Sequence, residues 1–263
     1  MWQNLLDVLL GAGFWVGGML AGAWILSLRR RDVSVADVFW GLGFAVVALY
    51  AFRVADGYIV RRAAVTALTV VWGVRLSLYI ARRRIGEQED RRYAAIRARV
   101  GPAWPLLSLP AVFASQGLAV LFFGLPVTWA QLSVAPGRTT WIDLLAALVW
   151  AIGFTFEALG DSQLRRFRAD PDNRGRVLDT GLWRYTRHPN YFGDALVFWG
   201  LFGFAVATPG GWWTIVSPIA LTLMLLRITG VPLLEEDMEQ RRPGYADYVR
   251  RTNAFFPGPP RRS

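Results

Sequence analysis

The chain contains no cysteine and no lysine, and it has a single histidine. Without cysteine it can form no disulfide, use no thiolate nucleophile and bind no zinc through sulfur. Without lysine it cannot form a Schiff base with a carbonyl substrate, because that chemistry needs a lysine amine. One histidine, His188, is too few for a multi-histidine metal site. We therefore expect an active site without a metal.

Charged residues are also scarce. They make up 18% of the 263 residues, whereas a soluble domain carries about a quarter. Hydrophobic residues reach 54%, and the mean hydropathy is +0.31. No polar linker divides the chain, so we expect a single membrane domain over 1–263.

Seven stretches have the roughly 20 apolar residues that a transmembrane helix needs. The first has no basic residue before it and three arginines after it, which is typical of a membrane span rather than a cleavable signal. The sequence thus predicts an all-α, polytopic membrane protein with seven transmembrane helices. They are expected at 5–28, 35–55, 63–82, 105–127, 141–161, 193–208 and 211–231.

Arginine placement predicts the orientation of these spans. The connections alternate between two sides, and one side holds 23 of the 29 arginines while the other holds 4. The positive-inside rule then places the N-terminus outside and the C-terminus in the cytoplasm. The net charge of +10 is spread over all four cytoplasmic segments, so topology accounts for it and we expect no nucleic-acid partner.

Six charged residues fall inside the predicted spans, where charge is costly and usually functional. Four of them share the cytoplasmic half, which predicts a polar cavity open to the cytoplasm. The alternative is that these side chains only reach for the membrane interface. The mid-span amide of Gln116 suits either helix packing or a ligand contact. The six are Asp37, Arg75, Glu157, Asp161, Asp194 and Arg227.

Two cytoplasmic segments have the composition of a ligand site. In the first, Asp161, Arg165 and Arg168 share one helix face and could bind an anionic group, although a juxtamembrane helix on anionic lipid would look the same. The second, 181–194, combines aromatic rings, positive charge and one amide, which suits the base, phosphates and carboxamide of a dinucleotide. An aromatic belt at the membrane interface is the alternative.

The second segment ends in Arg187-His188-Pro189-Asn190-Tyr191-Phe192-Gly193-Asp194. This run resembles the Arg-His-x-Asn-Tyr-x-Gly-Asp hallmark of the sterol C14-reductases and of the wider membrane-bound steroid 5-alpha-reductase family, including its bacterial branch. Ser162-Gln163 and Phe167-Arg168 match a second motif of that group. The resemblance covers about 155–257 and is weak in the first four spans.

The resemblance implies NADPH-dependent reduction of a conjugated carbon–carbon double bond in a steroid-like lipid or another hydrophobic enone. It places the protein in the inner membrane of a bacterium, with membrane lipid around it and a hydrophobic small molecule as substrate. Residues 141–257 would form the cofactor-binding half and 1–130 the substrate side. The chain has no Gly-x-Gly-x-x-Gly motif of a Rossmann fold. The implied cofactor-binding residues are Asp161, Arg165, Arg168, Arg176, Tyr185, His188, Asn190, Asp194, Arg227 and Glu236.

The substrate side departs from the family. Reductases of 3-keto steroids polarise the carbonyl with a Glu–Tyr pair, and Trp72 stands where that tyrosine belongs. Asp37 is the nearest acidic counterpart, and Tyr79 is a second candidate for the catalytic acid. A structural alternative for Asp37 is an ion pair with Arg75. Substrate contacts are expected from Trp40, Trp72 and Gln116.

Two other classes remain open. Isoprenylcysteine carboxyl methyltransferases and phospholipid methyltransferases also carry Arg-His-Pro-x-Tyr-x-Gly, with a Glu-Glu pair and a Gly-x-x-Tyr-like tail that compare with Glu235-Glu236 and 244–248. They use S-adenosylmethionine. Asn190 and Asp194 favour the reductase. A lipid-binding protein without catalytic activity is the third class, and it would leave the predicted polar cavity without a purpose.

Overall fold

The computed structural model describes residues 1–228, 230–231, 235 and 238–261, and these residues contain helices and no strand. The chain forms two compact units. Unit 1 consists of Met1–Asp143 and Phe204–Thr214, and unit 2 consists of Leu144–Gly203 and Ile215–Ser263. The predicted all-α class is confirmed.

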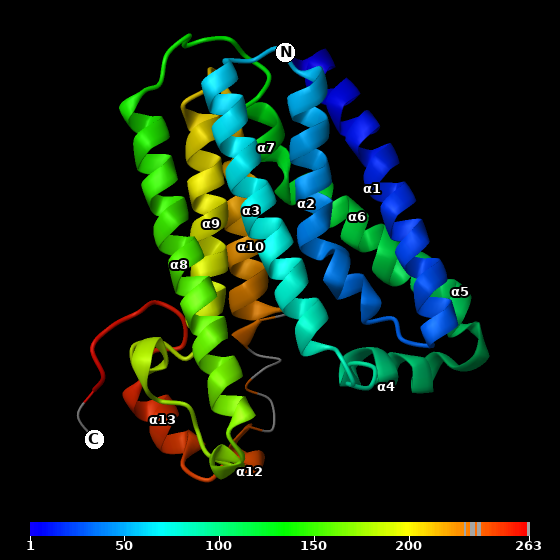
Figure 1. Cartoon of the computed structure of the whole chain (residues 1–263), viewed down its shortest axis with the longest axis vertical. Helices are drawn as coiled ribbons and strands as arrows, with labels where there is room; N and C mark the ends of the chain where they lie inside the picture. Colours follow the sequence, from blue (N-terminus) through cyan, green and yellow to red (C-terminus); the bar gives the residue numbers. More distant parts are fainter. Residues whose placement is uncertain (229, 232–234, 236–237, 262–263) are drawn as a thin grey trace. The chain divides into compact units, whose positions relative to one another are not determined.

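Five helical segments are long and apolar enough to cross a membrane, so the protein is a multi-pass membrane protein (Figure 1). The sixth predicted span corresponds to α9 (Pro189–Val206) and the seventh to the shorter apolar run Gly211–Arg227, which ends in α10 (Val216–Arg227). The count of seven spans and the orientation of the termini stay predictions. The five segments are α1 (Trp2–Arg30), α2 (Val35–Val54), α3 (Ile59–Arg83), the run Arg91–Phe123 and α8 (Trp141–Ala169).

The fourth predicted span is not one regular helix. It is preceded by a helix that the sequence did not indicate, α4 (Arg91–Val100). It then continues through α5 (Trp104–Ser108), a π-helical turn at Leu109–Ala114, and α6 (Ser115–Phe123), with α7 (Leu125–Trp129) after it. Proline stands near the start of α5, of the π turn and of α7. Because proline lacks a backbone N–H, it interrupts the regular helical ladder at these points.

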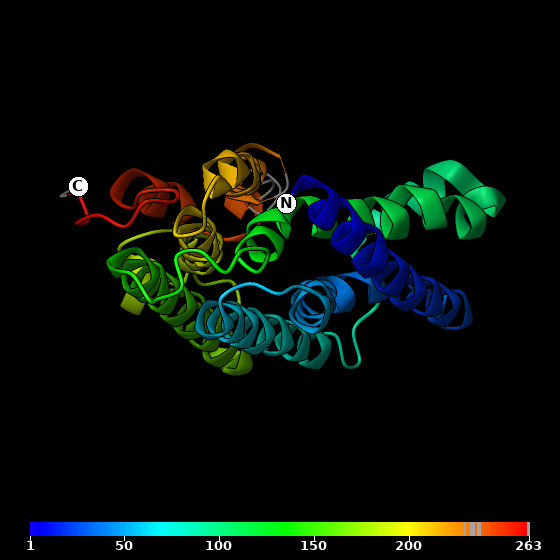
Figure 2. The same cartoon turned by 90° about the horizontal axis from the view of Figure 1, so that it is seen from above.

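In unit 1, α2 and α3 run side by side (Figures 1 and 2). A side chain on Gly41 would collide with the carbonyl oxygen of Gly73, and one on Gly73 would collide with that of Gly41. Small residues at such a crossing let the two backbones approach closely. Phe44 and Trp72 pack edge to face beside the crossing, with ring centroids 5.5 Å apart, and both are buried.

Unit 1 also contains a buried ion pair. Arg61 donates from Nε to Asp143 Oδ1 at 2.6 Å and from Nη2 to Oδ2 at 2.9 Å, and the exposures of the two side chains are 0% and 6%. Thr140 adds hydrogen bonds to Oδ2 from its backbone N–H and its hydroxyl, both at 2.8 Å. The third span was predicted to begin at 63, with Arg61 in a connecting loop, but α3 begins at Ile59 and includes Arg61. The pair supplies the counter-charge that permits this burial.

In unit 2, a row of glycines brings α8 and α9 into close contact. A side chain on Gly153 would lie 2.6 Å from the backbone nitrogen of Val197, and one on Gly200 would lie 2.6 Å from that of Trp150. Near the end of the row, a side chain on Gly160 would lie 3.1 Å from the nitrogen of Asn190. The first turn of α9 is thereby fixed against the last turns of α8. Two short helices, α12 (Met238–Arg241) and α13 (Tyr245–Arg251), follow α10 in this unit.

The buried pair predicts a large stability effect. Replacing Arg61 by methionine leaves the Asp143 carboxylate buried without its cation, and losing one partner of a buried pair costs about 3–5 kcal/mol. We expect Arg61→Met to lower the melting temperature of the purified protein in detergent by many degrees. Arg138→Gln is the matched control, since that arginine is exposed. Equal melting temperatures for the two variants would contradict the role given to the pair.

Candidate functional site

The site in unit 2 is built on the turn that precedes α9. The turn passes through the 3₁₀ helix Gly181–Arg184, whose first residue has a φ of 61°, a conformation that favours glycine. Leu182 N donates to Gln163 Oε1 at 3.0 Å, and Trp183 Nε1 donates to the carbonyl oxygen of Gly160 at 3.1 Å. The turn is thus tied to α8 on one side. Pro189 opens α9, a position where its missing N–H costs nothing.

Arg187, His188 and Glu235 form a hydrogen-bonded group beside this turn. Arg187 holds the carboxylate with two bonds, Nε to Oε1 at 2.8 Å and Nη2 to Oε2 at 3.0 Å. His188 Nε2 lies 2.9 Å from Oε1 of the same carboxylate. The side chains of Arg187 and His188 are 9% and 5% exposed. A two-bond arginine–carboxylate contact fixes both groups in one plane and is among the stronger polar contacts in proteins.

The charge state of Glu235 determines which nitrogen of the imidazole is protonated. Burial would raise the pKa of Glu235, but hydrogen bonds from His188 and Arg187 outweigh it and lower the pKa to about 2. An ionised carboxylate can only accept hydrogen bonds, so His188 Nε2 carries the hydrogen. The other ring nitrogen, Nδ1, is buried and has no hydrogen-bond partner within the described part of the chain. It is available to a ligand.

The C-terminal segment closes over the turn and holds it. Arg187 Nη1 donates to the carbonyl oxygen of Thr252 at 2.7 Å, and its backbone N–H donates to that of Asn253 at 2.9 Å. Tyr248, on α13, donates its hydroxyl to the carbonyl oxygen of Trp183 at 2.5 Å. Burial raises the pKa of Tyr248, so this hydroxyl remains a donor. Arg187 therefore positions both its neighbour His188 and the C-terminal segment at Thr252 and Asn253.

Asn190 and Asp161 meet next to this group. Asn190 Nδ2 donates to Asp161 Oδ1 at 3.2 Å, and Asp161 is buried. The amide oxygen of Asn190 is buried and has no hydrogen-bond partner among the residues with described positions. Together with Nδ1 of His188, it gives this side of unit 2 two buried polar atoms that a ligand with hydrogen-bond donors would satisfy. A carboxamide or a sugar hydroxyl group has the required chemistry.

The structure brings Asp161, His188 and Asn190 together out of the ten predicted cofactor-binding residues. Six others are exposed or partly exposed residues of unit 2. Glu236 lies outside the described residues. Its neighbour Glu235 binds Arg187 and His188, and the sequence analysis did not assign these contacts. The Glu235-Glu236 pair is the sequence feature that could have indicated them. The six are Arg165 and Arg168 on α8, Arg176 and Tyr185 in the following loop, Asp194 on α9 and Arg227 at the end of α10.

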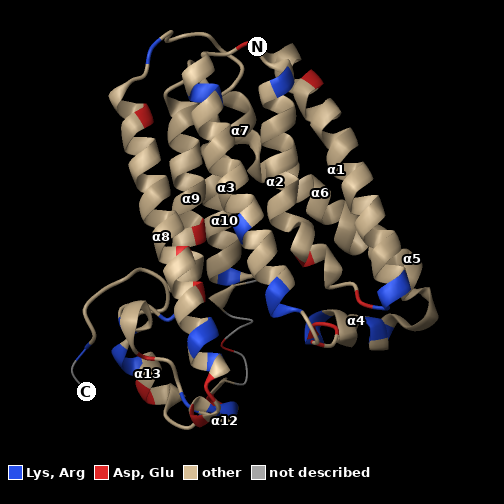
Figure 3. Ribbon diagram, in the orientation of Figure 1, with Lys and Arg blue, Asp and Glu red and all other residues tan. Residues whose placement is uncertain are grey.

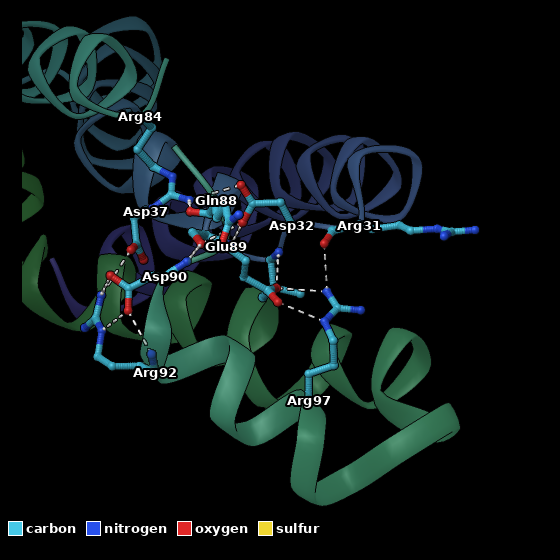
Figure 4. Close-up of polar contacts among 11 residues, drawn as sticks. Arg31, Asp32, Asp37, Arg84, Gln88, Glu89, Asp90, Arg92 and Arg97 are labelled. Atoms are coloured by element: carbon cyan, nitrogen blue, oxygen red, sulfur yellow. Dashed lines mark hydrogen bonds and ion pairs between the residues drawn. The ribbon is translucent and has the colours of Figure 1, made fainter. Parts of the chain in front are cut away.

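A second polar group lies in unit 1, where α2, α4 and α6 meet. Asp37 accepts hydrogen bonds from the Tyr93 hydroxyl at 2.9 Å, from Arg92 Nη2 at 3.3 Å and from Gln116 Nε2 at 3.4 Å. Figure 4 shows Asp37 and Arg92 facing each other across the α2–α4 contact. The structure thus brings Asp37, a predicted catalytic acid, next to Gln116, a predicted substrate contact. Tyr93 and Arg92 lie on α4, between the third and fourth predicted spans, where the hydropathy of the sequence does not indicate a helix.

The remaining predicted substrate-side residues are aromatic. Trp72 is fully buried in unit 1. Trp40 is half-buried, with its ring centroid 5.2 Å from that of Phe44. Tyr79 is half-buried and lies under the Arg75 guanidinium, whose central carbon is 5.5 Å from the ring centroid. Of these three, Trp72 has the character of a packing residue.

The chain belongs to the family described as "Protein of unknown function (DUF1295)", whose model matches residues 23–252. This family includes steroid 5-alpha-reductase-like proteins. An uncharacterized protein of Schizosaccharomyces pombe is 26% identical over 89% of this chain and 75% of its own length. No solved structure matches the chain. The broad resemblance is therefore confirmed, while the steroid-reductase branch stays a prediction.

The lowered pKa of Glu235 leads to a prediction of how the stability of the fold depends on pH. Its pKa lies near 2 in the folded protein, below its ordinary value of 4.5. The bonds to Arg187 and His188 therefore stabilise the fold fully above pH 4.5, and this stabilisation is lost as the pH falls towards 2. Melting temperatures measured across this range should fall more steeply for the wild type than for Glu235→Gln. Parallel curves would show that Glu235 is not ionised in this contact.

Proposed function

We propose that this member of the DUF1295 family reduces a conjugated carbon–carbon double bond in a hydrophobic enone, with NADPH as its cofactor. The observation that carries the proposal is the pair of buried, unsatisfied polar atoms, His188 Nδ1 and Asn190 Oδ1. They lie in the segment whose residue order resembles the reductase hallmark. Buried polar atoms normally find a partner, so this pair suggests that a ligand completes the site.

The residues of unit 2 fit this cofactor chemically. Asn190 offers an acceptor oxygen to an amide group, and its own amide is oriented by Asp161. With its hydrogen on Nε2, the His188 imidazole can offer a second acceptor at Nδ1. Arg165 and Arg168, which are exposed on the last turns of α8, could bind phosphate groups in the bidentate manner of guanidinium. When bound, NADPH supplies a hydride.

Unit 2 would contribute orientation rather than chemical reactivity. Two bonds from Arg187 hold Glu235, and Glu235 in turn holds the imidazole, so the site needs little reorganisation when a ligand arrives. Such preorganised polar groups are usually the main source of transition-state stabilisation. We propose that His188 binds and orients the ligand through Nδ1, while Glu235 holds the opposite side of the ring.

Reduction of an enone also requires a donor for the substrate oxygen, where negative charge develops. Within unit 1, the Asp37–Tyr93 pair has the chemistry of such a donor. While Asp37 is ionised, the Tyr93 hydroxyl donates to it. If Asp37 takes up a proton, it can donate to Tyr93 instead, which frees the phenolic hydrogen for a substrate oxygen. The protonation of Asp37 would thus control whether the donor is available.

Ligand titration tests the cofactor proposal. Purified protein should bind NADPH and not S-adenosylmethionine, measured by calorimetry. Asn190→Ala should weaken NADPH roughly three- to tenfold, the usual effect of one lost hydrogen bond. Arg166→Ala, which removes an exposed arginine from α8, is the control and should leave the affinity unchanged. Binding of S-adenosylmethionine alone would replace the reductase by the methyltransferase alternative.

Two substitutions test the donor proposal. Tyr93→Phe should leave NADPH affinity intact and reduce turnover of an accepted enone about a hundredfold or more, the usual contribution of a general acid. Asp37→Asn keeps a hydrogen-bond donor facing Tyr93 but cannot supply a proton, so it should reduce turnover less than Tyr93→Phe does. Tyr79→Phe is the matched control, because Tyr79 is also a half-buried tyrosine of unit 1. Loss of turnover in Tyr79→Phe with normal activity in Tyr93→Phe would assign the role to Tyr79 instead.

A further inference from the structure

One end of unit 1 gathers many arginines around a few carboxylates. The segments 29–37 and 82–99 contain ten arginines and five acidic residues. They come from the end of α1, the start of α2, the end of α3 and the whole of α4. Figure 3 shows the basic positions at the lower ends of α1 and α3 and along α4. Some of these arginines form ion pairs with carboxylates of the chain, and the others do not.

Carboxylates join these segments into one platform. Glu89 accepts two bonds from Arg97, each at 2.8 Å, and a third from the backbone N–H of Val33 at 2.9 Å. Arg97 also donates to the carbonyl oxygen of Arg31 at 3.1 Å, so α4 is tied to the end of α1 (Figure 4). Arg84 Nη2 lies 3.1 Å from Asp32 Oδ2, which ties in the end of α3. The position of α4 is therefore fixed by half-buried and exposed polar contacts.

Seven of the ten arginines take no part in this internal pairing. Within the described part of the chain, none of their guanidinium groups forms an ion pair with an acidic side chain, and all seven residues are exposed. They belong to three elements that the platform holds together, so their charges are concentrated on one rim of unit 1. They are Arg29, Arg30, Arg31, Arg82, Arg83, Arg91 and Arg99, and we call them the arginine rim.

We propose that the arginine rim binds the phosphate groups of anionic phospholipids in the membrane leaflet that it faces. Guanidinium groups match phosphate oxygens in a bidentate manner, and several basic residues beside a membrane span attract an anionic lipid surface. The neighbouring side chains favour lipid over a soluble polyanion. Ile85 and Leu106 are 79% and 72% exposed, and Ile96 on α4 is also exposed, so apolar groups flank the charges as in a helix that lies at an interface.

Lipid retention by the full-length protein tests this proposal. Native mass spectrometry of protein released from mixed micelles should show preferential retention of phosphatidylglycerol over phosphatidylcholine. Arg91→Gln combined with Arg99→Gln should lower phosphatidylglycerol retention roughly tenfold or more, since each basic residue near the surface adds to the attraction. Arg53→Gln with Arg138→Gln removes the same charge from exposed sites elsewhere in unit 1 and should have no such effect.

Three outcomes would overturn the proposal. Equal losses in the two double variants would show that net charge alone attracts the lipid. Unchanged phosphatidylglycerol retention in the Arg91→Gln, Arg99→Gln double variant would show that the arginine rim does not bind lipid. If that variant does not fold, the Arg29→Gln, Arg30→Gln double variant provides the same test. Inorganic phosphate that displaces phosphatidylglycerol at equal concentration would indicate a site for free phosphate.

Discussion

The contact on which unit 2 depends is the one between Arg187, Glu235 and His188. Two bonds from the guanidinium fix the carboxylate, and the carboxylate fixes the hydrogen of the imidazole. The same arginine holds the backbone of Thr252 and Asn253. One side chain therefore connects the turn before α9, Glu235 and the C-terminal tail. Removing it would leave Oε2 of a half-buried carboxylate and the carbonyl oxygen of Thr252 without this donor, which is costly.

The sequence predicted the parts of this site that lie close together along the chain. His188 and Asn190 stand in one motif, and Asp161 lies near the end of the preceding helix, so helix geometry and residue order sufficed. Glu235 is 47 residues from His188. Which of two adjacent glutamates faces the motif depends on how the chain returns after α10, and residue types alone do not determine that. The prediction accordingly chose Glu236.

The same limit explains the errors in unit 1. Hydropathy located the spans, but it could not show that α3 begins early enough to bury Arg61 against Asp143, a partner 82 residues away. Nor could it show that Asp37 meets Tyr93 from α4. Arginine counts predicted which segments are basic. The structure adds which arginines are paired internally and which remain on the rim.

Nitrogen-15 NMR of the imidazole tests the account of unit 2 most directly, because His188 is the only histidine and gives one pair of signals. We predict a hydrogen on Nε2 and none on Nδ1, whose resonance shifts when NADPH is added while that of Nε2 changes little. Glu235→Gln should abolish this fixed tautomer. A hydrogen on Nδ1, or no change of the Nδ1 signal at saturating NADPH, would contradict the proposed site.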